Sequence, residues 1–185
     1  MNTSRKLLLA GAAAISLTAM ASSAFAQASA TGTGTASAAV IQPLTIADTT
    51  DLAFGRVTTS AASGTVTVSA TGTRGFSGGV TLAGGTATNG LFTANGEPNQ
   101  AVTVTLVSGA LTLHGTTSAT NTLTGTVAST VATTGGASTT LGAAGTGTGA
   151  TFGNLLIPIS GALTIPANAA SDSYTGTYQV TVAYN

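Results

Sequence analysis

The chain alternates apolar and hydroxyl residues with a period of two, in short runs that glycine, asparagine and proline interrupt. Val102, Val104 and Leu106 alternate with threonines, and the segment from Tyr178 to Tyr184 repeats the pattern. A period of two places apolar side chains on one face of a β-strand, whereas a helix needs a period near 3.6. Turn signals recur about every 8 to 12 residues, which is typical of a sandwich or a barrel. We therefore predict an all-β, immunoglobulin-like (pilin-like) β-sandwich of eight to ten strands.

The first 26 residues have the organisation of a signal peptide. A basic start precedes an apolar run, and a small-x-small motif ends at Ala26, immediately before Gln27. An uncleaved membrane anchor is the alternative, but polar residues inside the apolar run and the lack of a stop-transfer charge disfavour it. We expect a signal peptide over residues 1–26, a flexible N-terminal arm over 27–42 and one sandwich domain over 43–185. The mature protein is then expected in the periplasm, on the outer surface or outside the cell.

Few charges remain after this processing. Residues 27–185 keep two arginines against four carboxylates, for a formal net charge of −2, and contain no lysine and no cysteine. Nucleic acids and acidic membrane surfaces are bound by clusters of basic residues, so we expect no nucleic-acid partner. We also expect no permanent membrane span in the mature form. Without disulfides, stability has to come from apolar burial and from hydrogen bonds within the sheets.

The residues that normally carry catalysis or bind metals are scarce. His114 is the one histidine, and the alternation places it opposite Leu111 and Leu113 beside a turn, as expected of a solvent-facing side chain. Asp48 and Asp51 offer too few oxygens for calcium, which takes six to eight. We therefore predict no enzymatic activity, no cofactor and no metal.

Two segments rich in small residues are predicted to lie between strands. Residues 72–79 are glycine-rich but lack the lysine and the following helix of a phosphate-binding loop, so a turn between two strands is expected. Residues 133–150 contain glycine, threonine, alanine and serine around Leu141, which predicts a long flexible loop or a weak hairpin.

Sheets with so few charges lack the usual block against strand addition at their edges. The strand predicted at the C-terminal end of the chain either pairs within a sheet or borders a groove that a strand from another chain fills. In the second case the groove would be lined by Tyr178, Val180, Val182 and Tyr184. The N-terminal arm has an alternation compatible with a donor strand, and its bulky residues are Val40, Ile41, Leu44 and Ile46.

Several short motifs resemble the bacterial family called domain of unknown function 4402 (DUF4402). They are PLTI at 43–46, DLAFG at 51–55, SGTVTV at 63–68 and GTYQVTVAY at 176–184, and the resemblance runs from about residue 38 to 185. It implies a small exported protein without an assigned catalytic site.

The ending of the chain is also similar, more distantly, to the last strand of chaperone-usher pilins and spore-coat U-like proteins. Tyr184, one residue from the end, matches the penultimate tyrosine of many pilins. This similarity implies an incomplete immunoglobulin-like sandwich that a neighbour's arm completes, and an export chaperone that holds the C-terminal strand beforehand. Many pilins carry a disulfide, which this chain cannot form.

We therefore expect a non-enzymatic structural protein, a pilin-like subunit of a surface filament or surface layer that self-associates by strand addition. A monomeric, adhesin-like surface-binding module is the first alternative. A soluble periplasmic domain without a binding role is the second.

Overall fold

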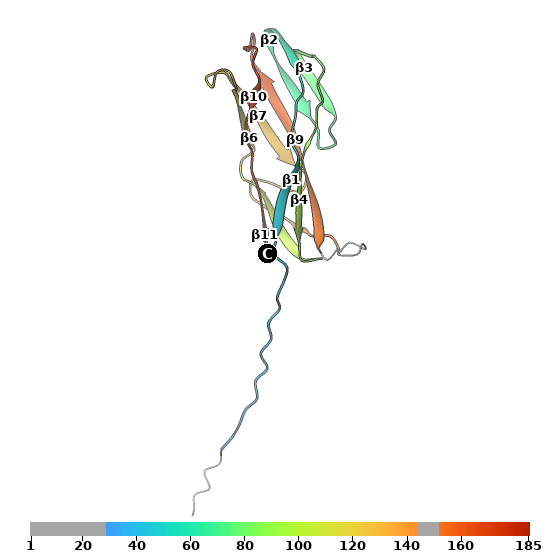
Figure 1. Ribbon diagram of the computed structural model, residues 1–185, viewed down its shortest axis with the longest axis vertical. Helices are drawn as coiled ribbons and strands as arrows, with labels where there is room; N and C mark the ends of the chain where they lie inside the picture. The colour runs from blue at the N-terminus through green and yellow to red at the C-terminus, as the bar shows by residue number, and fades with distance from the viewer. Residues whose placement is uncertain (1–28, 144–151) are drawn as a thin grey trace, which may run out of the picture. The chain divides into compact units, whose positions relative to one another are not determined.

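The computed structural model describes residues 29–143 and 152–185, and every element among them is a β-strand (Figure 1). The predicted signal peptide, with its cleavage point at Ala26 and Gln27, lies outside these residues. Residues 29–38 form a unit of their own, in which no residue belongs to a strand and all are exposed. All strands belong to the unit 39–185. Nothing in the described part of the chain is a helix long and apolar enough to span a bilayer.

Eleven strands make up the fold. They are β1 (Thr45–Thr50), β2 (Val57–Val68), β3 (Arg74–Leu82), β4 (Gly90–Gly96), β5 (Ala101–Leu106), β6 (Ala110–Gly115), β7 (Thr122–Ser129), β8 (Ala137–Thr140), β9 (Gly153–Ile165), β10 (Tyr174–Thr175) and β11 (Val180–Tyr184).

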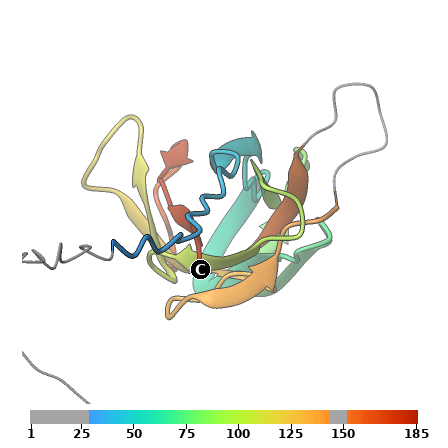
Figure 2. The ribbon, with the colours of Figure 1, turned by 90° about the horizontal axis from the view of Figure 1, so that it is seen from below.

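The strands form two sheets in which all pairs of named strands are antiparallel. The larger sheet has eight strands in the order β1-β4-β9-β7-β6-β10, with β2 joining β9 to β3. The smaller sheet has the order β11-β5-β8. Figure 2 views the fold along its length, with the strands of both sheets around one interior.

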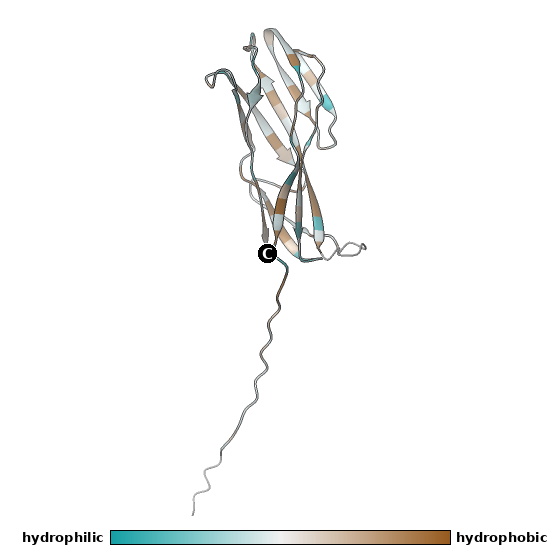
Figure 3. Ribbon diagram, viewed as in Figure 1, coloured by the Kyte–Doolittle hydropathy of each residue, from teal (hydrophilic) through white to brown (hydrophobic). Residues whose placement is uncertain are grey.

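Strand β9 is the central strand of the larger sheet. Its first half pairs with β4, its second half pairs with β2, and β7 lies along its other side. Along its 13 residues the inward positions alternate with outward ones, and Ile157, Ile159, Leu163 and Ile165 are all at most 4% exposed. This period-two alternation is visible as colour bands along the strands in Figure 3.

One apolar core joins the two sheets. Its buried side chains come from both, including Val102 and Val104 of β5 and Ile157 and Ile159 of β9. Among the described residues no polar or charged residue is buried. Apolar burial and the backbone ladders therefore hold the sandwich together.

The predicted all-β class and the predicted inward faces are confirmed. Val66 and Val68 are buried, as are Leu111 and Leu113, while His114 on the opposite face is exposed. The two-sheet arrangement agrees with the predicted sandwich.

Four predictions need correction. The described residues form eleven strands rather than eight to ten. The run from Tyr174 to Tyr184 is interrupted: β10 pairs with β6 in the larger sheet, and the chain then crosses to pair β11 with β5 in the smaller one.

Segment 72–79 is a turn only at its start, because Arg74–Leu82 is strand β3. Residues 137–140 form β8 rather than loop, and residues 144–151 lie outside the described part.

The contrast between two neighbours on β9 provides a test of the core. Replacing Ile157 (0% exposed) by alanine removes buried methylene groups and leaves a cavity, so the free energy of unfolding should fall by about 2–5 kcal/mol. The matched control Leu156→Ala, at a residue 54% exposed, should cost less than about 1 kcal/mol. Urea denaturation of both variants measures the difference, and equal losses would show that the inward face of β9 is misassigned.

Candidate assembly site at the β11 edge

Strand β11 has a partner on one side only. It pairs with β5 in the register Val180 to Leu106, Val182 to Val104 and Tyr184 to Val102, and no strand of the described chain pairs with its other side. The N–H of Val107 donates to Gln179 and that of Asn185 to Ala101, so the odd-numbered residues of β11 face β5. In an antiparallel pair alternate residues point their backbone groups to opposite sides. The N–H and C=O groups of Val180, Val182 and Tyr184 therefore face the unpaired side.

The core is incompletely covered along this edge. Val102, Val104 and Leu106 on β5 are at most 2% exposed. Their register partners on β11 pack against the same core but remain only half-buried, as does Tyr178 just before the strand. We call Tyr178, Val180, Val182 and Tyr184 the open β11 edge. They are the four residues that the sequence predicted for an assembly groove, and the structure brings them together in one row.

Tyr184 lies at one end of this row, where its hydroxyl is hydrogen-bonded. Its hydroxyl donates to the carbonyl of Gln42 (2.9 Å) and accepts from the N–H of Glu97 (2.7 Å). The N–H of Gln42 in turn donates to the Glu97 carboxylate (3.1 Å). These three bonds tie the C-terminal strand, the base of the N-terminal arm and the end of β4 into one cluster.

Tyr178 lies at the other end of the row. Its ring packs edge-to-face on Phe92 of β4, with 5.8 Å between the ring centroids and 89° between the planes. Gly90 makes room for the hydroxyl, because a Cβ there would lie 2.2 Å from it. Burial and the negative charge of Asp48 raise the pKa of Tyr178 to about 12. The two tyrosines thus contact the larger sheet at both ends of the row and leave Val180 and Val182 between them.

Strand β1 borders the larger sheet and bears an acidic side chain. Asp48 pairs in register with Phe92, whose ring packs inward on Tyr178, and burial together with Asp51 raises the pKa of Asp48. Asp48 is exposed, and a charged side chain on an edge strand discourages the addition of another strand. The five residues of β11 carry no charge.

The structure divides the predicted donor residues into two pairs. Val40 is 98% exposed and Ile41 is 47% exposed, and neither belongs to a strand. Leu44 packs against the core, and Ile46 lies on β1 opposite the buried Ala94. The described chain before Thr45 belongs to no strand, although Leu44 already packs against the core.

The other sequence candidates have local structural roles. His114 is exposed, with Nδ1 3.3 Å from the carbonyl oxygen of Ala119. Asp172 accepts N–H groups from Thr117, Ser118 and Ser173. Desolvation opposes its ionisation, but these donors outweigh it and hold the pKa of Asp172 well below its usual range. In the described part of the chain, no three His, Cys, Asp or Glu residues gather where a metal ion could bind.

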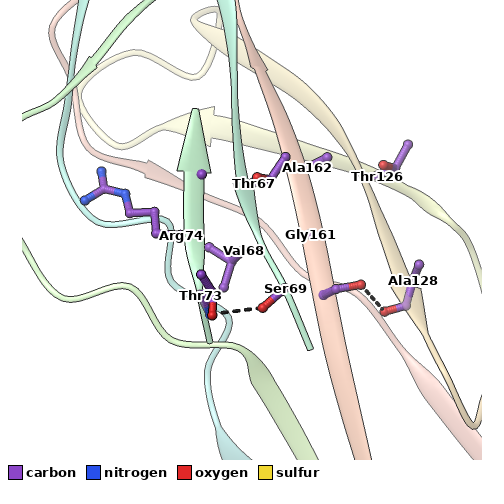
Figure 4. Close-up of a pocket in the computed structure, with 11 residues that line it drawn as sticks. Thr67, Val68, Ser69, Thr73, Arg74, Thr126, Ala128, Gly161 and Ala162 are labelled. Carbon is purple, nitrogen blue, oxygen red and sulfur yellow. Dashed lines mark hydrogen bonds between the residues drawn. The ribbon is translucent and has the colours of Figure 1, made fainter. Parts of the chain in front are cut away.

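A shallow hollow of about 450 Å³ is lined by residues that do not belong to the β11 edge (Figure 4). Its lining is mostly hydroxyl and small side chains from β2, β3, β7 and β9, among them Thr67, Ser69, Thr126 and Ser160. Arg74 also borders it, but the guanidinium donates to the backbone carbonyls of Arg56 and Gly84. No carboxylate and no histidine is among these lining residues.

The comparisons with known proteins agree with the motifs of the sequence. The model of a family described as a domain of unknown function, DUF4402, matches residues 44–184. The chain belongs to the DUF4402 family. Neither a curated protein nor a solved structure matches it. The match begins one residue before β1 and ends on the last residue of β11, so the DUF4402 domain coincides with the two sheets and the N-terminal arm precedes it.

Sequence reasoning missed the partners of the two tyrosines. Gln42, Gly90, Phe92 and Glu97 are up to 142 positions away from the tyrosines along the chain, and no local pattern links them. The dipeptide Asn89-Gly90 is by its residue types a signal for a turn, and it gives no sign of the close approach of a tyrosine.

The Tyr184 cluster predicts a specific stability loss in the DUF4402 domain. Tyr184→Phe removes the hydroxyl and leaves the partly buried Glu97 N–H without its acceptor, so unfolding should become easier by about 1–3 kcal/mol. Tyr174→Phe is the control, because that hydroxyl donates one exposed bond, to Ala170. Thermal unfolding of both variants measures the effect, and a loss in the control as large as that at Tyr184 would contradict the cluster.

The raised pKa of Tyr178 predicts a loss of stability at high pH. The unfolded state releases this proton near pH 10 and the folded state near pH 12, so the unfolded state gains stability as pH rises between these values. The stability that the neutral phenol provides is fully present below pH 10 and is lost toward pH 12. Tyr178→Phe should flatten that part of the curve, measured by denaturation at several pH values and by phenolate absorbance. An unchanged slope would contradict the assignment.

Proposed function

We propose that this protein is a non-enzymatic, exported structural protein, a pilin-like subunit whose copies assemble by adding a strand to the open β11 edge. The observation that carries the proposal is the row of half-buried side chains on β11, facing register partners on β5 that are completely buried. A strand laid beside β11 would cover this apolar surface and pair the backbone groups of Val180, Val182 and Tyr184.

A comparison of the sheet edges favours β11 as the acceptor. Strand β8 has four residues and β10 has two, which is short for strand addition. Strand β1 carries the exposed charge of Asp48, and β3 begins with Arg74 and pairs irregularly with β2. Strand β11 is five residues long, regular and uncharged.

The arm before the family domain is the proposed donor. Residues 29–38 are exposed and unpaired within one chain, and the large side chains of Val40 and Ile41 remain in solvent. Exposed apolar residues next to a free strand-like segment are typical of surfaces that a partner covers. Because the donor and the acceptor are different parts of the chain, copies can join head to tail and extend into a filament or layer.

A second candidate function rests on the hollow of about 450 Å³. Its hydroxyl lining offers hydrogen bonds to a sugar or a peptide, as a monomeric surface-binding module would need. It lacks the aromatic platforms that carbohydrate sites favour, which makes it the weaker candidate.

Deletion of the arm tests the assembly proposal. The chain from Gln27 to Asn185 should form polymers that grow with concentration, whereas the same chain without residues 27–40 should remain a folded monomer. Light scattering and electron microscopy measure the particles, and circular dichroism checks the fold. A peptide of residues 27–41 should bind the shortened protein in a one-to-one ratio. Equal polymer yield with and without the arm would overturn the proposal.

Adjacent positions on β11 give a matched test of the acceptor. Val182→Lys places a charge in the half-buried row and should abolish polymers, whereas Thr181→Lys, on the exposed face, should leave them intact. Thermal unfolding of both monomers separates loss of assembly from loss of folding. Polymers formed by a folded Val182→Lys protein would exclude β11 as the acceptor edge.

A further inference from the structure

The arm has two chemically different faces when it is extended. From residue 30 to residue 40 the even positions are alanine, glycine and finally Val40, with no hydroxyl among them. From residue 29 to residue 37 every odd position is serine or threonine. Successive side chains of a strand point to opposite faces, so this segment as a strand has one small apolar face and one hydroxyl face.

The acceptor row is apolar. Tyr178, Val180, Val182 and Tyr184 are bulky side chains that pack against the core and remain partly exposed. Alanine and glycine on the inward side of an incoming strand would allow a close approach of the two backbones without overpacking this row. Hydroxyl groups on the inward side would lose water without a fixed partner, which is unfavourable.

The length of the free segment fits an exchange between copies. Residues 29–41 reach about 43 Å at about 3.3 Å per residue, whereas the row from Tyr178 to Tyr184 spans about 23 Å. About half of the segment can pair while the rest joins two subunits. In a single chain, residues 29–38 form no strand and are exposed, which favours a second copy as the acceptor.

We infer that the arm of one copy enters the open β11 edge of another with its even-numbered alanine and glycine face toward the core and its serine and threonine face in solvent. This inference rests on the proposed function and adds the orientation of the donor. The hydroxyl face would then continue the threonine-rich outer surface of the sandwich across the joint between two subunits.

Single cysteines in the arm test the orientation, because the natural chain has none. Ala36→Cys and Ser37→Cys are neighbours on opposite faces of the extended segment. In monomers of either variant that also carry Val182→Lys, a water-soluble maleimide should label both positions at the same rate. In preformed polymers, labelling at position 36 should become at least about tenfold slower, while position 37 should label as in the monomer.

Each result of the labelling experiment decides between the two claims. Protection at position 37 instead of 36 would overturn the orientation while leaving assembly by the arm intact. Equal protection at both positions would also overturn it, because no face would then be selected. Polymers in which neither position is protected would overturn the arm as donor. If the unmodified chain forms no polymers, the proposed function itself fails, and the electron micrographs show this independently of any labelling.

Discussion

Hydrogen bonding between neighbouring strands is the interaction on which the rest of this structure depends. The chain has no cysteine, and the described residues bury no charged group, so neither disulfides nor internal ion pairs hold the two sheets. Each strand contributes an apolar face, and neighbouring strands on both sides help to cover it. Strand β9 has three partners, and its inward residues are buried. Strand β11 has a partner on one side, and its inward residues are only half-buried.

The same constraint explains how far the sequence could predict the fold. Alternation within a strand is a local property, so the inward faces of Val66 and Val68, and the exposure of His114, could be read from spacing alone. The change of sheet between β10 and β11 is not local. It arises because β10 pairs with β6 while β11 pairs with β5, so two halves of one alternating segment have different partners. The alternation continues through the whole segment and gave no sign of a break.

The candidate site was partly predictable for a similar reason. Three of its four residues lie on one face of β11 and Tyr178 precedes them at the same spacing, so their row followed from the period of two. Their partial exposure did not follow, because it arises from a missing neighbour rather than from the residues themselves. The sequence grouped Leu44 and Ile46 with Val40 and Ile41 as donor residues. In a single chain, Leu44 packs against the core and Ile46 pairs with Ala94 of β4, which no local pattern indicated. Glycine-rich β3 was missed as a strand because its glycines gave a turn signal stronger than the β-propensity of Phe76 and Val80.

The hydrogen bonds around Tyr184 have a mechanical consequence. A pull on the N-terminal arm reaches the folded domain at Gln42, where the chain is fastened both to the C-terminal strand and to Glu97. Tension is thereby shared between the two sheets instead of peeling β1 away from β4 one bond at a time. In a chain of linked subunits, this fastening would make each domain resist stretching at the place where the load enters it.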